Sequence, residues 1–106
     1  MKMIVAIIRP EKLEAVKENL TEVGVTGLTI TDVRGHGTQS GITITTSVGS
    51  TVIDEIEKVK IETVIDDDME ESCIDAVISA ANTGHYGDGR IFVLPVERSI
   101  RVRQEP

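Results

Sequence analysis

Residues able to hold an anion gather in one short stretch, 83–93, which contains the sequence Thr-Gly-His-Tyr-Gly-Asp-Gly-Arg-Ile-Phe-Val. Gly87 and Gly89 carry no Cβ, so backbone amides around them can approach an anion closely. Arg90 follows directly, and a guanidinium can bind a phosphate group through two parallel hydrogen bonds. The spacing therefore predicts a phosphate or nucleotide site. The plainer interpretation is a tight turn before a strand.

More positive charge lies near the end of the sequence, at Arg98, Arg101 and Arg103. The chain as a whole is acidic, with a net charge of −7 and a pI of about 4.7. Such a surface repels nucleic acid and anionic lipid at long range, so we expect no direct nucleic-acid binding. The three arginines either form a local positive pocket for an anion or belong to a solvated strand that balances the acidic surface.

The totals indicate one small domain. A chain of 106 residues with 40% hydrophobic and 27% charged residues is typical of a globular protein. Cys73 is the only cysteine, which excludes an internal disulfide and favours a reducing compartment, so we expect a cytoplasmic protein. The apolar start is too short for a signal peptide, and no run approaches the roughly 20 residues of a membrane span, so no membrane insertion is expected.

The elements that must position these residues begin with an apolar run, 1–8, which predicts a strand buried on both faces. Arg9-Pro10 ends this strand, and Pro10 suits the first turn of a helix. Residues 28–33 are rich in β-branched types and predict a second strand. Between them, an amphipathic helix ending at Gly24 is indicated by apolar residues at three- and four-residue steps: Leu13, Val16, Leu20 and Val23.

The segment 35–57 breaks this regularity with several glycines and then a run rich in Thr, Ser and β-branched residues, 42–53. It predicts either a hairpin or a long flexible loop. A connection of this length inside a small domain is often functional.

The second half repeats the strand–helix–strand order. Alternation over 59–65 predicts a strand, Asp66-Asp67-Asp68 suits the capped start of a helix, and 90–96 predicts another strand. Residues 100–103 alternate briefly and predict a short terminal strand. The apolar face of the second helix is expected at Cys73, Ile74, Val77, Ile78 and Ala81. The whole order predicts an α+β, ferredoxin-like split βαβ fold (β-α-β-β-α-β) with a long loop between strands 2 and 3.

Two other clusters could do chemistry. The acidic run 66–71 could bind a metal, but helix capping and solvation are favoured because a calcium site spreads its ligands through a glycine-containing loop. His36 and His85 lie in glycine-rich turns and could accept a phosphate. A plain turn role is favoured for both, because no carboxylate–histidine set is placed to activate a nucleophile. Cys73 is expected to fill a core position.

Several separated segments resemble the PII signal transduction proteins. They are the opening Met3 to Pro10 with Lys12-Leu13, then 24–29, 33–37, 58–62 and 83–93. The resemblance covers almost the whole chain and implies one PII-like domain over 1–106, with the family's T-loop at 35–57.

What the resemblance implies is a homotrimer with nucleotide sites in clefts between subunits. Such proteins bind ATP and ADP in competition, bind 2-oxoglutarate together with Mg-ATP, and regulate a partner through the shape of the T-loop. The partner would be a transporter, an enzyme or a regulator. No enzymatic activity is implied.

Family roles transfer to matching positions. Gly87, Asp88, Gly89 and Arg90 would hold phosphates, with Arg101 and Arg103 reaching them from the neighbouring subunit. Thr29, Glu62 and Val64 would surround the adenine, and Gly35, His36, Gly37 and Thr38 would close the other side. Gln39 and Lys58 would contact 2-oxoglutarate, and Gln39 also Mg.

The departures from the family pattern lie in the T-loop region. Thr38 replaces a phosphate-contacting arginine, which leaves the ATP-over-ADP preference open. Thr51 replaces the tyrosine that many relatives modify, so no modification is expected there, and Ser47 replaces the arginine that plugs an ammonium channel. Two alternatives remain: a specialised paralogue that senses adenine nucleotides only, and a small phosphoryl-transfer enzyme using His85 or His36 on the same fold.

Overall fold

A computed structural model of the chain describes residues 1–36, 42–47, 49–53 and 55–104, with the backbone alone for 42–46 and 50–53. The elements in chain order are β1 (Lys2–Ile8), the 3-10 turn η1 (Pro10–Lys12), α1 (Leu13–Glu22), β2 (Thr29–His36), β3 (Ile42–Thr46), β4 (Gly49–Ile53), β5 (Glu55–Ile65), the 3-10 turn η2 (Asp67–Met69), α2 (Glu70–Ala81) and β6 (Gly89–Pro95).

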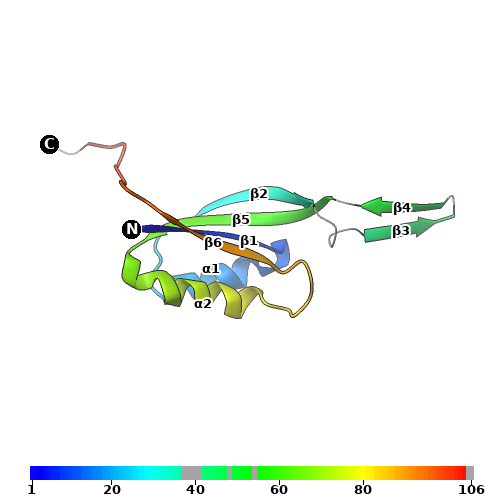
Figure 1. Cartoon of the computed structure of the whole chain (residues 1–106), viewed down its shortest axis with the longest axis horizontal. Helices are drawn as coiled ribbons and strands as arrows, with labels where there is room; N and C mark the ends of the chain where they lie inside the picture. The colour runs from blue at the N-terminus through cyan, green and yellow to red at the C-terminus, as the bar shows by residue number, and fades with distance from the viewer. Residues whose placement is uncertain (37–41, 48, 54, 105–106) are drawn as a thin grey trace.

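Four of these strands form one antiparallel sheet in the order β2-β5-β1-β6. Both helices lie on the same face of this sheet (Figure 1). The arrangement confirms the predicted α+β, ferredoxin-like fold. Because β1 and β6 are neighbours, the end of β1 lies beside the start of β6, with Ile8 opposite Gly89.

The core lies between the sheet and the helices. Ile4, Ala6 and Ile8 of β1 face it, and they pair across the sheet with buried residues of β5. The remaining buried apolar residues come from both helices, β5 and the α1–β2 connection: Val16, Leu20, Val25, Val59, Ile61, Ile65, Cys73, Ala76, Val77 and Ala81. Cys73 therefore fills the core position expected of it.

The prediction that β1 is buried on both faces is wrong for this chain. Its residues alternate between buried and half-buried, because only one face of the sheet is covered by helices. The uncovered face, called here the open face, carries Met3, Val5 and Ile7 of β1, flanked by Phe92 and Leu94 of β6 and by Val64 of β5. Phe92, Leu94 and Val64 are each 40–46% exposed.

The predicted helix faces are confirmed with one exception. Val16, Leu20, Cys73, Val77 and Ala81 are buried, and Leu13, Val23 and Ile74 pack against the core. Ile78 is 49% exposed instead. It lies on the side of α2 toward the edge strand β6, and the described residues place no further strand beyond β6.

The acidic run before α2 does not cap the helix as predicted. Asp66 precedes η2 without a side-chain capping hydrogen bond, and α2 itself begins after Met69. Asp67 binds the amino group of Met1 at 3.0 Å instead. Among the described residues, no three His, Cys, Asp or Glu side chains come together as metal ligands.

The segment between β2 and β5 contains a hairpin, which decides between the two alternatives for 35–57. β3 and β4 pair with each other in register from Ile42–Ile53 to Thr46–Gly49 and form a sheet of their own. The hairpin projects beyond one end of the four-stranded sheet (Figure 1). β2 and β5 are also longer than predicted, pairing as far as His36 and Glu55.

The predicted short terminal strand at 100–103 is wrong for the chain by itself. Residues 96–104, called here the tail, contain no helix or strand after Val96 donates a hydrogen bond to Met1. The tail leads away from the sheet at the end opposite the hairpin (Figure 1), so it has no neighbouring strand with which to pair.

Candidate functional site

The loop 82–88 connects α2 to β6, and this loop together with the first two residues of β6 holds the glycines and charges that the sequence singled out. α2 ends at Ala81, and the glycines that follow adopt positive φ angles: 80° at Gly84, 93° at Gly87 and 117° at Gly89. At Gly89 a Cβ would lie only 1.8 Å from the Ile7 carbonyl oxygen. This position therefore requires glycine, because any side chain would collide with the neighbouring strand.

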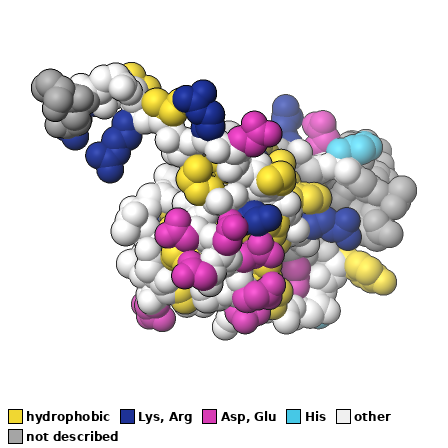
Figure 2. All heavy atoms as spheres, turned by 60° about the vertical axis from the view of Figure 1, so that its left-hand side comes forward, with side chains coloured by type: hydrophobic (Ala, Val, Ile, Leu, Met, Phe, Trp, Pro, Cys, Tyr) yellow, Lys and Arg dark blue, Asp and Glu magenta, His cyan; other side chains and the backbone are white. Residues whose placement is uncertain are grey.

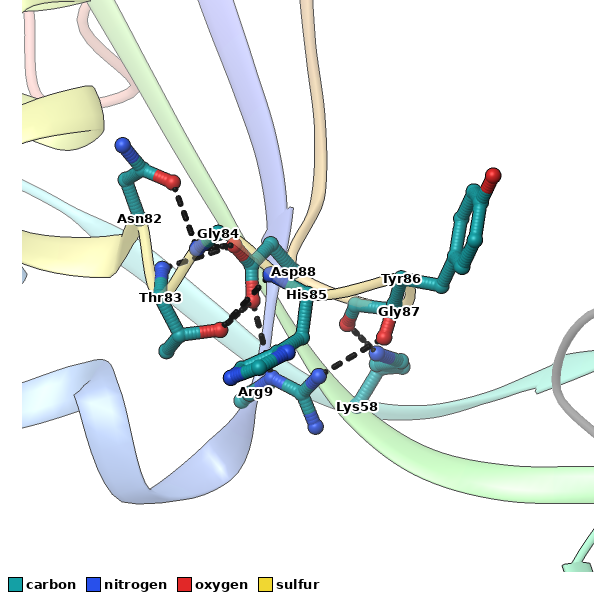
Figure 3. A network of polar contacts seen from close by, with 9 residues as sticks. All are labelled: Arg9, Lys58, Asn82, Thr83, Gly84, His85, Tyr86, Gly87 and Asp88. Atoms are coloured by element: carbon teal, nitrogen blue, oxygen red, sulfur yellow. Dashed lines mark hydrogen bonds and ion pairs between the residues drawn. The ribbon is translucent and has the colours of Figure 1, made fainter.

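Asp88 is the centre of the loop (Figure 3). Its carboxylate accepts hydrogen bonds from the backbone amides of Thr83, at 2.7 Å, and Gly84, at 3.0 Å, and from the Thr83 hydroxyl. These bonds, those of Thr83 foremost, lower the pKa of Asp88 far below its usual value. Asp88 therefore stays ionised and fixes the loop from within. A direct contact between Asp88 and a nucleotide stays a prediction.

Arg9 supplies the cation for this carboxylate. Its Nε lies 3.1 Å from Asp88, and its terminal amino group donates to the Tyr86 carbonyl at 2.8 Å. Both groups are partly shielded from water, with 27% and 21% of their side chains exposed. Sequence reasoning treated Arg9 only as the end of a strand. The available signal was its place directly after β1, which the fold brings beside the start of β6.

Lys58 approaches the same loop from β5. Its ammonium group donates to the Gly87 carbonyl, and the residue is only 9% exposed. Burial, and then the nearby Arg9, lower the pKa of Lys58. Two cations thus meet at the loop, one bound to Asp88 and one to the backbone. A contact between Lys58 and a ligand stays a prediction.

The adenine-site candidates form a second group on the sheet. Thr29 of β2 pairs directly with Glu62 of β5. A hollow of about 390 Å³ is lined by Thr29, Glu62 and Val64 together with Met3, Gly27, Leu28 and Thr63. Glu62 also lies 3.7 Å from the Lys60 ammonium group. The structure therefore brings these three predicted residues together.

The two groups do not meet within one chain. Lys58 and Glu62 are four residues apart on β5, which is a separation of about 13 Å along a strand. Arg101 and Arg103 are exposed on the tail, and Arg90 is exposed at the start of β6. One chain thus carries separate parts of the predicted site.

The remaining predicted residues surround the base of the hairpin. Gly35 and His36 end β2, opposite Ile56 and Glu55. A hollow of about 370 Å³ beside them is lined by Pro10, Asp32, Val33, Arg34, Glu57 and Lys58. Gly37, Thr38 and Gln39 lie outside the described residues, so the predictions for them stay predictions. Thr51 lies within β4, and Ser47 in the turn between β3 and β4.

His85 lies in the 82–88 loop, exposed, with its backbone amide donating to the Thr83 hydroxyl at 3.3 Å. His36 is exposed at the end of β2. Lys58 and Asp88, the charged groups nearest the loop's backbone, are already bonded to the loop itself. The arrangement is that of a loop fixed by its own hydrogen bonds and by two neighbouring cations, Arg9 and Lys58. A phosphate-accepting role for either histidine stays a prediction.

Comparison with known proteins identifies the family of the chain. The family model described as "Nitrogen regulatory protein P-II" matches residues 1–106, and the chain belongs to this family. Nitrogen regulatory protein P-II of Haemophilus influenzae is 48% identical over 103 residues, covering 97% of this chain and 92% of the relative. Nitrogen regulatory protein P-II 1 of Escherichia coli K12 and the P-II protein of Klebsiella oxytoca are each 50% identical with the same coverage. Across the described residues, no helix is both long and apolar enough to span a membrane.

Proposed function

We propose that this P-II family chain is a homotrimeric signalling protein that binds ATP or ADP in clefts between subunits. It reports the bound state to a partner protein through the T-loop. The observation that carries the proposal is the 82–88 loop, whose path is fixed by hydrogen bonds of Asp88 and Arg9 and which is flanked by Lys58 and Arg90. In an acidic chain, the cations gathered at this loop, Arg9, Lys58 and Arg90, are a local concentration of positive charge.

The separation of the site into parts supports its assembly between subunits. Gly87, Gly89 and Arg90 of one subunit would bind phosphates, and a neighbour would contribute Arg101 and Arg103. The hollow at Thr29, Glu62 and Val64 would take the adenine. The exposed apolar residues of the open face favour such an assembly, because a contiguous apolar sheet face on a small domain usually marks an interface.

2-Oxoglutarate would bind with Mg-ATP, its carboxylate meeting Lys58. The ammonium group already lies at the loop, so it needs only to exchange the Gly87 carbonyl for a carboxylate. Gln39 would contact the effector and Mg. The carboxylate would bind one conformation of the T-loop more tightly than the other. A difference of a few kcal/mol in binding free energy is enough to shift the populations of the two conformations.

The role proposed is regulation without catalysis, and the names of the relatives describe those proteins as regulatory. One observation favours a second candidate, a paralogue that senses adenine nucleotides only. Lys58 already has a partner in the Gly87 carbonyl, so it could serve the loop without any carboxylate ligand.

Isothermal titration tests both candidates. Mg-ATP, Mg-ADP and 2-oxoglutarate are titrated separately, and 2-oxoglutarate again in the presence of Mg-ATP. Binding of 2-oxoglutarate only with Mg-ATP, lost in Lys58→Ala and kept in the α1 control Lys17→Ala, supports the full proposal. Nucleotide binding with no 2-oxoglutarate response supports the second candidate. No nucleotide binding at all would reject both.

A further inference from the structure

The hairpin formed by β3 and β4 lies in the longest uncharged stretch of the chain. Residues 37–53 contain no Lys, Arg, Asp or Glu, and all 29 such residues (11 plus 18) lie elsewhere in the sequence. An uncharged run of 17 residues is unexpected in a chain of which 27% is charged. The run also contains no proline. The hairpin therefore lacks the charges and prolines that natural proteins use to prevent an edge strand from pairing with another chain.

The strand β3 has one unpaired edge. It pairs with β4 on one side, and the described residues place no strand on its other side. All five residues of β3 are β-branched, Ile-Thr-Ile-Thr-Thr, and such residues favour strands. β4 instead begins at Gly49, with a φ of 137°. The outer edge of β3 is therefore the better template for a further strand.

A second copy of β3 fits this edge. A strand that pairs antiparallel with its own copy about a twofold axis makes the same contacts from both sides. If the axis passes through Ile44, that residue lies opposite its own copy. Thr43 then lies opposite Thr45, and Ile42 opposite Thr46, so all five residues are paired. Cross-strand pairs of β-branched residues stabilise such a ladder.

Charge favours a meeting of two copies at the hairpin. The chain has a net charge of −7, and Figure 2 shows acidic side chains on the body of the molecule. The hairpin projects beyond the four-stranded sheet (Figure 1), so antiparallel pairing of two β3 strands puts the two bodies at opposite ends of the pair. Five strand residues span about 16 Å, which is twice the Debye length of about 8 Å at physiological ionic strength. The repulsion between the bodies is therefore largely screened, and the hairpins carry no charge that would repel.

We infer that β3 pairs antiparallel with β3 of a second molecule and so joins two molecules through their hairpins. The joined sheet has four strands, β4-β3-β3-β4, whereas a sheet of two strands alone is marginally stable in water. The pairing depends on the hairpin and not on the proposed nucleotide site. Its regulatory consequence rests on the proposed function, because a hairpin occupied by its own copy is withheld from a partner protein.

Cysteine cross-linking tests the pairing directly. Ile44 and Thr51 are cross-strand partners within the hairpin, so they lie at the same level of it. Ile44→Cys is oxidised at high protein concentration without nucleotide, and we expect covalent dimers on a non-reducing gel, because a disulfide needs Cα atoms within about 7 Å. Thr51→Cys is the matched control. Its two copies would lie three strand spacings apart, about 14 Å, so it should stay monomeric on the gel, as should the wild type with its buried Cys73.

Sedimentation velocity gives a second test without cross-linking. Ile44→Lys places like charges opposite each other in the joined sheet, so the average mass should no longer rise with protein concentration. Thr51→Lys adds the same charge at the same level of the hairpin, on the strand away from the joint. Its mass should rise with concentration as that of the wild type does. The variants should keep the fold, because every buried core residue among those described lies outside 42–53.

Either of two results overturns the pairing: equal or absent cross-linking of the two cysteine variants, or a wild-type mass that does not depend on concentration. The proposed function is judged separately by the nucleotide titration. Cross-linking of Ile44→Cys in a protein that binds no nucleotide supports the pairing and rejects the proposed function. Normal nucleotide binding without the cross-link does the reverse.

Discussion

At the residue scale, the carboxylate of Asp88 accepts hydrogen bonds from residues of its own loop, 82–88. The carboxylate holds Thr83, Gly84 and Arg9 at once, so one side chain fixes the path of the backbone between α2 and β6. A loop fixed in this way loses little entropy when a ligand binds, because its conformation is already set. Asp88 therefore organises the candidate site, whether or not it also contacts the ligand.

The depressed pKa of Asp88 predicts a pH effect. An unfolded aspartate titrates near 3.8, and the folded group titrates well below that value. The stabilising contribution is therefore complete above about pH 4 and is lost as the pH falls toward the folded pKa. Urea unfolding between pH 2.5 and pH 6 should show a steeper loss of stability on acidification for the wild type than for Asp88→Asn.

Asp67 does not affect the comparison of the wild type with Asp88→Asn. Its pKa is also lowered, by a hydrogen bond from the N-terminal amino group, but Asp67 is present in both chains and its contribution cancels. Parallel pH dependence of the two chains would mean that the Asp88 network contributes nothing to folding.

Gly89 gives a second prediction at this scale. Gly89→Ala places a Cβ against the Ile7 carbonyl at a φ of 117°, so backbone strain and overpacking add. We expect the free energy of unfolding to fall by about 2 kcal/mol or more. Gly27→Ala is the control, because nothing lies within 4 Å of its Cβ position, and it should change stability by less than about 0.5 kcal/mol. Equal losses from both substitutions in urea unfolding would contradict the geometry.

At the scale of the helices and strands, their positions were easier to predict from the sequence than the contacts that they make. Local periodicity was enough to place β1, α1, β5 and α2, because each buries a continuous stripe of apolar residues. The uncovered face of β1 was missed, since apolar residues look the same whether a helix or another subunit covers them. The role of Arg9 was missed because its partners are 77 and 79 residues away in the chain. Only the pairing of β1 with β6 brings them together.

The tail and the hairpin both show that local sequence does not reveal whether a segment has a neighbouring strand with which to pair. Alternation at 100–103 suggested a strand, but a strand needs a neighbour, and the single chain offers the tail none. Residues 42–53 left a hairpin and a loop equally open, because β-branched residues and glycines suit both. Pairing of β3 with β4 decided between them.

The hairpin should be dispensable for folding. It forms its own sheet, and every buried core residue among those described lies outside 42–53. Replacing 42–53 with a short Gly-Ser linker should therefore shift Tm by no more than about 4 °C, which corresponds to less than about 1 kcal/mol. Mg-ADP affinity should stay within threefold of the wild type, because no proposed nucleotide contact lies in this segment. A collapse of Tm would show that the hairpin contributes to the core fold, contrary to the topology.

At the scale of the whole molecule, one face of the four-stranded sheet is covered by the helices and the other, the open face, is uncovered. Helices cover the first, while the open face leaves Val64, Phe92 and Leu94 about 40–46% exposed around the half-buried residues of β1. In a chain of 106 residues, this apolar surface is better explained by an interface than by chance. The separated parts of the proposed nucleotide site favour the same interpretation, because the proposed site would be completed by a neighbouring subunit.

Phe92→Lys tests both conclusions at once. Phe92 lies outside the buried core, so the subunit should keep its fold, as judged by circular dichroism. A buried lysine in an apolar interface is costly, so light scattering should show the trimer replaced by monomer. Ala15→Lys, exposed on α1, adds the same charge away from the open face and should stay trimeric. The monomer should also bind Mg-ATP at least tenfold more weakly, because it lacks the residues a neighbour contributes. A monomer that binds Mg-ATP as tightly as the wild type would instead mean that one chain holds the complete site.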